Sequence, residues 1–126
     1  MLQGNNHQTM PYRDEHLSID FDQQAVALDS DRMTLTRKEY DLLALLVQHA
    51  GEIIPRDALL MQVWGYGAEI RTRTLDVHVR RLRKKLGGYA DQYIETIFGI
   101  GYRFQPYRAP RFFQGQLSKP AIALGA

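Results

Sequence analysis

The spacing of apolar residues changes twice along this chain of 126 residues, and that pattern limits its fold more than any other feature. Over about residues 16–36, as in HLSIDF, AVAL and MTLT, apolar residues alternate with polar ones, which predicts a small antiparallel meander with one buried face. The spacing then becomes helical, and over 94–104 the segment IETIFGIGYRF returns to short apolar runs around a Gly-Ile-Gly centre, which predicts a hairpin. The order of strands, helices and hairpin predicts an α+β domain.

Three helices are expected between the strands and the hairpin. The first begins at a T-x-x-E capping box formed by Thr36 and Glu39, and it ends near Gly51. The second covers about residues 56–64, and the third covers about residues 72–86. The second and third helices are joined by a short loop, the third is very basic, and a hairpin follows. This order is the layout of a winged helix, a variant of the helix-turn-helix.

The net charge of +2 conceals a strong separation of charge along the chain. Residues 1–70 carry five basic and eleven acidic side chains, whereas residues 71–126 carry eleven basic and three acidic ones. This separation indicates that one surface meets a polyanion, with a merely solvated basic helix as the alternative. The chain has no cysteine, its longest apolar run is LLALLV, and no signal segment opens it, so we expect a cytoplasmic protein that contacts no membrane.

The third predicted helix has two unlike faces. The core face is a narrow stripe of apolar residues at helical spacing: Leu75, Val79, Leu82 and Leu86. The opposite face carries cations around one apolar residue: Arg73, Val77, Arg80, Arg81 and Lys84, with Thr74 beside them. Segment 71–86 holds seven basic residues but only one acid, Asp76, so its like charges repel unless an anion neutralises them. Val77 matches a thymine methyl in the DNA major groove, and arginine matches guanine or phosphate, so we expect this helix to bind DNA.

Three segments, LTRKEYDLLALLVQHAGEIIPRDALLMQVWG, RTRTLDVHVRRLRKKL and IETIFGIGYRF, resemble the effector domain of OmpR/PhoB-type bacterial response regulators, over about residues 16–105. The resemblance implies a winged helix-turn-helix with an N-terminal four-stranded antiparallel sheet, three helices and a C-terminal β-hairpin wing. It also implies sequence-specific control of transcription, with the third helix in the major groove and the wing at the adjacent minor groove. We therefore expect a linker or disordered segment at 1–12, the DNA-binding domain at 13–105, and a weakly ordered tail at 106–126.

The resemblance further implies which residues contact DNA. The groove-reading positions match Thr74, Asp76, Val77 and Arg81. The positions that contact the DNA backbone match Trp64, Arg73, His78, Arg80, Arg83, Thr96 and Tyr102, and the basic face adds Lys84. Two of these residues have a second interpretation: Asp76 orients an arginine instead of reading a cytosine, and Trp64 packs in the core.

The tip of the wing, Phe98, Gly99 and Ile100, is the part least like the family, because many relatives carry an arginine at the position of Phe98. An arginine suits the negative potential of the minor groove, and phenylalanine does not. Three placements of Phe98 are open: against sugars or wedged into the groove, folded back on Ile100 or Tyr102, or on a neighbouring protomer.

The resemblance also implies partners. The first partner is double-stranded DNA with direct repeats, which a head-to-tail dimer binds. RNA polymerase is the second, through loop 65–72, whose exposed candidates are Tyr66, Glu69 and Ile70, although the loop is alternatively only an irregular connection. The resemblance also implies a sensor kinase and a receiver domain on the N-terminal side in a longer protein. This chain contains no receiver, so a stand-alone regulator is the alternative.

The sequence has no catalytic or metal-binding constellation and no cofactor motif, so we do not expect an enzyme. The alternative function is a winged-helix module that docks its basic helix on an acidic partner protein.

Overall fold

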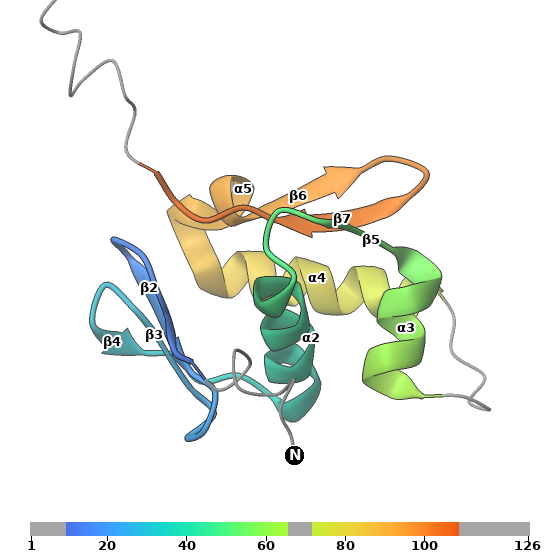
Figure 1. Cartoon of the computed structure of the whole chain (residues 1–126). Helices are drawn as coiled ribbons and strands as arrows, with labels where there is room; N and C mark the ends of the chain where they lie inside the picture. Colours follow the sequence, from blue (N-terminus) through green and yellow to red (C-terminus); the bar gives the residue numbers. More distant parts are fainter. Residues whose placement is uncertain (1–9, 66–71, 109–126) are drawn as a thin grey trace, which may run out of the picture.

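The computed structural model describes residues 10–65 and 72–108, and two small sheets flank its helices (Figure 1). The predicted linker up to residue 9, loop residues 66–71 and the tail from residue 109 lie outside the described residues. Within the described ranges, no helix is long and apolar enough to cross a membrane.

The N-terminal sheet is the predicted meander. Its antiparallel strands follow chain order: β1 (Tyr12–Arg13), β2 (Leu17–Asp20), β3 (Ala25–Leu28) and β4 (Asp31–Arg32). Leu17, Ile19 and Val26 point into the core and are buried, as the alternation predicts. The linker expected through residue 12 ends earlier, because Tyr12 pairs with Ile19 and its ring lies edge-on to Phe104 with the centroids 5.5 Å apart.

Three main helices follow: α2 (Arg37–Gln48), α3 (Arg56–Trp64) and α4 (Thr72–Leu86). The predicted capping box is present at the start of α2, where the Glu39 backbone N–H donates to Thr36 Oγ1 (3.2 Å) and the Thr36 N–H donates to Glu39 Oε1 (3.0 Å). Glu39 is only 2% exposed, and Lys85 of α4 donates to its Oε1 at 2.5 Å. The same carboxylate therefore caps α2 and joins it to α4.

The hairpin belongs to a three-stranded sheet of order β5-β7-β6, formed by β5 (Ile53–Pro55), β6 (Ile94–Ile97) and β7 (Gly101–Phe104). Strand β5 was not predicted, because three residues ending in proline show no periodicity. A Cβ built on Gly101 would lie 2.0 Å from the backbone oxygen of Ile54, so only glycine allows β5 and β7 to approach this closely.

The GGYADQ segment after the third helix forms a 3₁₀ turn, η2 (Gly87–Tyr89), and a short helix, α5 (Ala90–Tyr93). Tyr93 is fully buried, and its ring stacks on Phe104 at 5.5 Å. This buried contact favours a helical turn directly after the two glycines.

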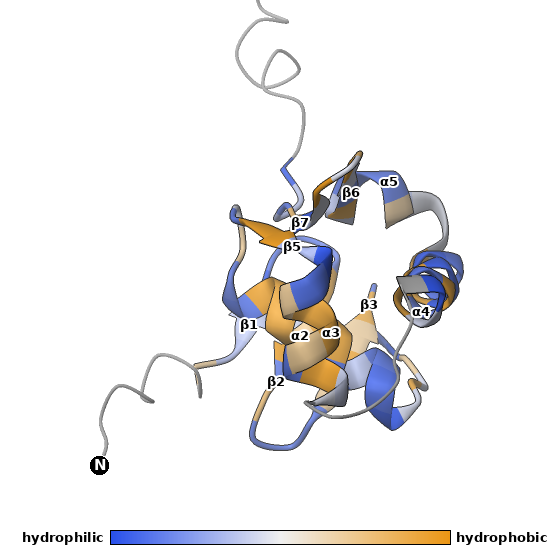
Figure 2. Ribbon diagram, turned by 90° about the vertical axis from the view of Figure 1, so that its right-hand side faces the viewer, coloured by the Kyte–Doolittle hydropathy of each residue, from blue (hydrophilic) through white to orange (hydrophobic). Residues whose placement is uncertain are grey.

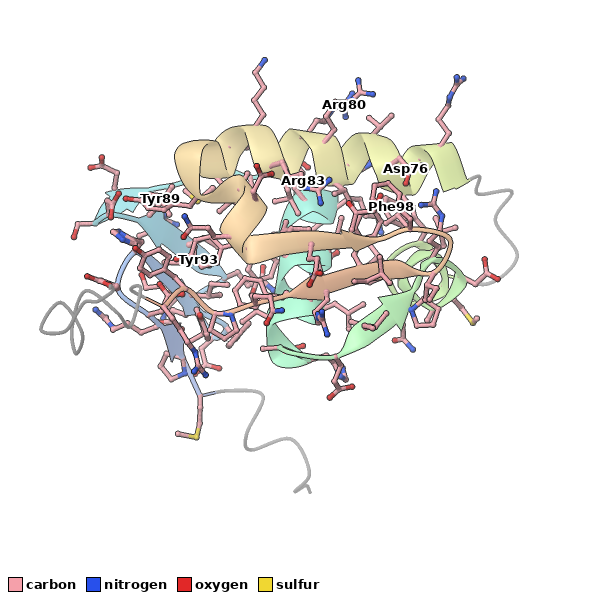
Figure 3. The ribbon with its side chains drawn as sticks, turned by 90° about the horizontal axis from the view of Figure 1, so that it is seen from above. Asp76, Arg80, Arg83, Tyr89, Tyr93 and Phe98 are labelled. Carbon is pink, nitrogen blue, oxygen red and sulfur yellow. The ribbon has the colours of Figure 1, made fainter. Side chains whose placement is uncertain are left out.

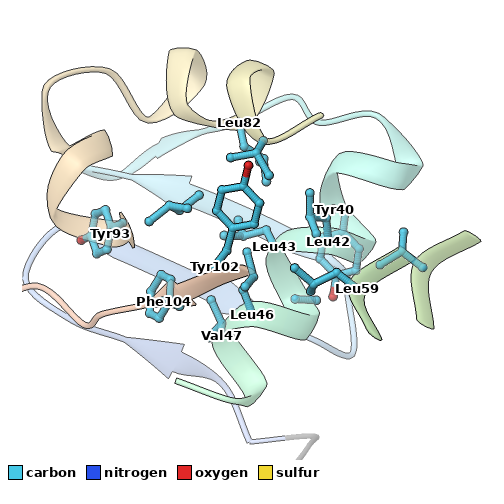
Figure 4. Packing of buried hydrophobic residues seen from close by; sticks show 14 of the residues in the cluster. Tyr40, Leu42, Leu43, Leu46, Val47, Leu59, Leu82, Tyr93, Tyr102 and Phe104 are labelled. Carbon is cyan, nitrogen blue, oxygen red and sulfur yellow. The ribbon is translucent and has the colours of Figure 1, made fainter. Parts of the chain in front are cut away.

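The core lies between the helices and the two sheets. In Figure 2, where the ribbon is coloured by hydropathy, α2, α3 and β5 contain hydrophobic segments. Figure 4 shows the buried side chains that meet there, which include Leu42, Leu43, Leu46, Leu59, Leu82, Tyr93, Tyr102 and Phe104.

Asp14 joins the two ends of the described domain. It accepts hydrogen bonds from the hydroxyls of Tyr12 (2.5 Å) and Tyr93 (2.7 Å) and from the backbone N–H groups of His16, Leu17 and Tyr107. Burial alone raises the pKa of Asp14, but the hydrogen bonds from Tyr12, Leu17, Tyr93 and His16 hold the pKa below its ordinary value. The start of the expected tail is thus packed on the domain, since Tyr107 also lies edge-on to His16 at 4.5 Å.

Candidate nucleic-acid interface

The outer face of α4 is a strongly basic surface. Leu75, Val79, Leu82 and Leu86 are buried, as predicted, which turns the opposite side of the helix outward. The exposed cations on that side are Arg73, Arg80, Arg81 and Lys84. Within residues 10–65 and 72–108 none of these four forms an ion pair. Figure 3 shows side chains of α4, Arg80 among them, projecting away from the body of the molecule.

Val77 and Thr74 lie half-buried on α4. The core stripe runs along the other side of the helix, so Val77 is an apolar residue on a largely cationic face, as the sequence predicted. The face can therefore offer charge to an anion and an apolar contact to a base edge.

Arg83 binds the wing instead of pointing outward. Its Nη2 donates to the backbone oxygen of Ile94 (2.9 Å) and to Thr96 Oγ1 (2.7 Å), and its guanidinium lies 5.7 Å from the centre of the Tyr102 ring. Arg83 and Thr96 were both expected to contact phosphate. They contact each other here, and the contact ties α4 to β6.

Asp76 joins three elements. Arg56, at the start of α3, donates from Nη2 to Asp76 Oδ2 (2.6 Å), and the Tyr102 hydroxyl of β7 donates to Oδ1 (2.8 Å). The hydrogen bond from Arg56 is the main cause that lowers the pKa of Asp76, and burial opposes it only in part. Both carboxylate oxygens are occupied, which matches the arginine-orienting interpretation of Asp76.

Tyr102 differs from its expected role as a phosphate contact, because it is only 5% exposed and its hydroxyl is used by Asp76. Burial, and then the hydrogen bond to Asp76, raise its pKa. The sequence did not identify Arg56 as a residue of this site. Arg56 and Asp76 are twenty positions apart in the chain, and the one signal for their pairing was that a lone acid on a basic helix needs a cationic partner.

Trp64 and His78 pack against each other at the junction of α3 and α4, with ring centroids 4.9 Å apart. The His78 Nδ1 lies 2.8 Å from the backbone oxygen of Thr74; since a carbonyl only accepts, Nδ1 carries the proton. Lys38 donates to the backbone oxygen of Val63 (2.8 Å) and lies 6.0 Å from the Trp64 ring centre. Trp64 is half-buried, so its core packing, the second interpretation above, is present.

The wing ends in a tight turn. The Ile100 N–H donates to the backbone oxygen of Ile97 (2.9 Å), and Gly99 has a φ of +78°, as the third residue of a type II turn requires. Phe98 is 89% exposed and Ile100 is 50% exposed. The placement of Phe98 folded back on Ile100 or Tyr102 is therefore wrong, because a ring packed on the hairpin would lose most of that exposure.

Two further expectations concern the rest of the site. Tyr66, Glu69 and Ile70, the candidates for a polymerase contact, lie outside the described residues. Across the described ranges, no group of three His, Cys, Asp or Glu side chains is placed to hold a metal ion.

A basic helix, its supporting helix and a hairpin tied to both define the winged-helix class of DNA-binding domain. A family model described as "Transcriptional regulatory protein, C terminal" matches residues 30–104, and the chain belongs to this family. Its fold is that of OmpR/PhoB-type effector domains, as the sequence predicted.

Three known proteins illustrate the similarity. The response regulator ArlR of Staphylococcus saprophyticus is 42% identical over 85 residues, which cover 67% of this chain but 39% of that regulator. The response regulator DrrB of Thermotoga maritima, an OmpR/PhoB homologue, is 32% identical with a TM-score of 0.70, covering 75% of this chain and 44% of that one. The Klebsiella pneumoniae RstA DNA-binding domain, solved in complex with the RstA box, is 34% identical with a TM-score of 0.69. The match covers 77% of this chain and 98% of that domain.

Proposed function

We propose that this chain binds double-stranded DNA in a sequence-specific manner and regulates transcription as the effector domain of a two-component response regulator. The observation that carries the proposal is the outer face of α4, where four exposed cations surround Val77 and none has an acidic partner among the described residues. The similarity to the RstA DNA-binding domain, solved with its DNA, supports the same function.

The proposed contacts divide by position. Thr74, Val77 and Arg81 read base edges in the major groove, while Arg73, Arg80 and Lys84 bind phosphates. His78 joins the phosphate contacts through Nε2 when its imidazole is protonated on both nitrogens, because its Nδ1–H is used by Thr74. Trp64 supports His78, with its indole N–H as a further phosphate donor. Asp76, Arg83, Thr96 and Tyr102 hold the wing against α4 instead of binding DNA directly.

The proposed partners follow from the family. Because the chain spans 39% of the length of ArlR, a receiver domain and a sensor kinase belong to the complete regulator. Two copies bind direct repeats head to tail, since one recognition helix has a small footprint. The segment 65–72 contacts RNA polymerase.

The test uses duplexes selected from a random-sequence DNA pool with this chain, followed by titration at several salt concentrations. The three phosphate-binding cations, Arg73, Arg80 and Lys84, predict that log K falls with log[salt] at a slope of about −3. An exposed basic residue on the N-terminal sheet serves as the control, and Arg32→Gln should leave the affinity unchanged. A slope near zero, with no sequence enriched, would refute the proposal.

The alternative is docking on an acidic protein. That function needs the cations but gives Val77 no role. If the helix reads bases, Val77→Ser should therefore change which DNA sequences are selected. If the helix only meets acidic side chains, the same substitution should change its binding to the acidic partner little.

A further inference from the structure

The wing tip combines exposure with a lack of charge. Phe98 is 89% exposed, Ile100 is 50% exposed, and Gly99 separates them, so the turn presents apolar surface to solvent. Such a tip cannot respond to the negative potential of a DNA groove in the way that a cation does. Its chemistry suits contact with the apolar faces of bases and sugars instead.

The backbone of the tip is held in place. The Arg56 N–H donates to the backbone oxygen of Ile100 (3.0 Å), and the Ile100 N–H closes the turn on Ile97. The absence of a side chain at Gly101 lets β5 support the hairpin at close range. Phe98 is thus projected from a braced turn, which limits the entropy lost when the ring is inserted into a partner.

The tip is also fixed relative to the basic face of α4. Arg56 binds Ile100 through its backbone and Asp76 through its side chain, so one residue spans the tip and the recognition helix. Arg83 adds a second tie through Thr96. Figure 3 shows the hairpin running alongside α4, with Phe98 at its turn. Any DNA seated on α4 therefore has the wing tip at a set position beside it.

We propose that Phe98 is an apolar wedge: it enters the minor groove beside the major groove occupied by α4 and partly unstacks one base step. This inference rests on the proposed function, because α4 positions the DNA. Unstacking costs least at flexible pyrimidine–purine steps such as TA and CA/TG. The wedge thus bends the duplex and adds specificity for such a step at one place in the site.

The experiment uses the complete chain and a duplex with a single half-site, selected from random DNA by the native chain, so that no neighbouring protomer is present. We would measure affinity, salt slope and DNA bending for the native chain, Phe98→Ala, Phe98→Leu and Phe98→Arg. Bending is measured by energy transfer between dyes at the duplex ends. Ile53→Ala is the matched control, since Ile53 is an apolar residue of the same sheet, 42% exposed and paired with Arg103 away from the tip.

Phe98→Ala is expected to weaken binding about tenfold, to reduce the bend and to leave the salt slope unchanged, because no charge is lost. Phe98→Leu should retain part of the bend, and Phe98→Arg should steepen the slope by about one unit. Equal affinity and bending for native chain and Phe98→Ala would overturn the wedge. An effect of Phe98→Ala that appears only on two adjacent half-sites would also overturn it, in favour of a contact between protomers. Failure of the native chain to bind any duplex would instead refute the proposed function.

Discussion

Replacing Gly101 by alanine should cost more stability than any other glycine substitution in the described part of the hairpin. The added Cβ would lie 2.0 Å from the Ile54 backbone oxygen and 2.9 Å from the Cα of Pro55, whereas ordinary contact begins at 3.4 Å. Both neighbours are backbone atoms and cannot rotate away, so β5 and β7 must separate by about 1 Å or more. Overpacking of this kind costs about 1–3 kcal/mol, and weakened hydrogen bonds of the β5–β7 pairing add about 1 kcal/mol, so we expect a loss of about 2–4 kcal/mol.

Thermal unfolding followed by circular dichroism measures this loss, which corresponds to a decrease in Tm of roughly 10–20 °C for a domain of this size. Gly88→Ala is the matched control, because a Cβ there meets nothing within 4 Å. Gly99→Ala separates backbone strain from crowding: its φ is +78° but its Cβ meets nothing, so it should lose only about 1 kcal/mol. A Tm for Gly101→Ala equal to that of Gly88→Ala would refute the close approach of the two strands.

Four other predictions concern charges. Arg81→Ala should cost about 1–3 kcal/mol of binding and relax selection at one base pair, whereas Arg80→Ala should weaken all sequences alike and reduce the salt slope by about one unit. Arg83→Gln should lower affinity through a looser wing but leave the slope unchanged; a change of one unit would return Arg83 to the phosphate contacts. Asp76→Asn should cost about 1 kcal/mol of stability, after allowance for the partial exposure of its ion pair with Arg56. The pKa values of Asp14 and Glu39 are lowered from their ordinary values of 3.8 and 4.5. The two carboxylates therefore add stability that is present above these ordinary values and is lost as the pH falls below them. Urea midpoints should decline below about pH 4.5, and the decline should be less steep in Glu39→Gln.

The sequence predicted the elements whose signal is local. The capping box lies within four residues, and the stripe of Leu75, Val79, Leu82 and Leu86 repeats at the helical period, so both were confirmed. The ties between elements have no such signal. Arg83 and Thr96 are thirteen residues apart, and Arg56 and Asp76 are twenty apart, so only the folded chain brings them together. Strand β5 was not predicted for a related reason, because its pairing with β7 depends on the missing side chain of Gly101.

The cations of the second half of the chain therefore serve two purposes that their number alone does not separate. Arg83 and Lys85, although part of the basic helix, are used inside the domain, against the wing and against Glu39. Arg73, Arg80, Arg81 and Lys84 stay exposed. Because Arg83 fixes the wing relative to α4, the exposed cations can act at set distances from the wing tip. In this domain, the geometry between helix and wing and the charge offered to DNA thus depend on different residues of one helix, and each can be changed without the other.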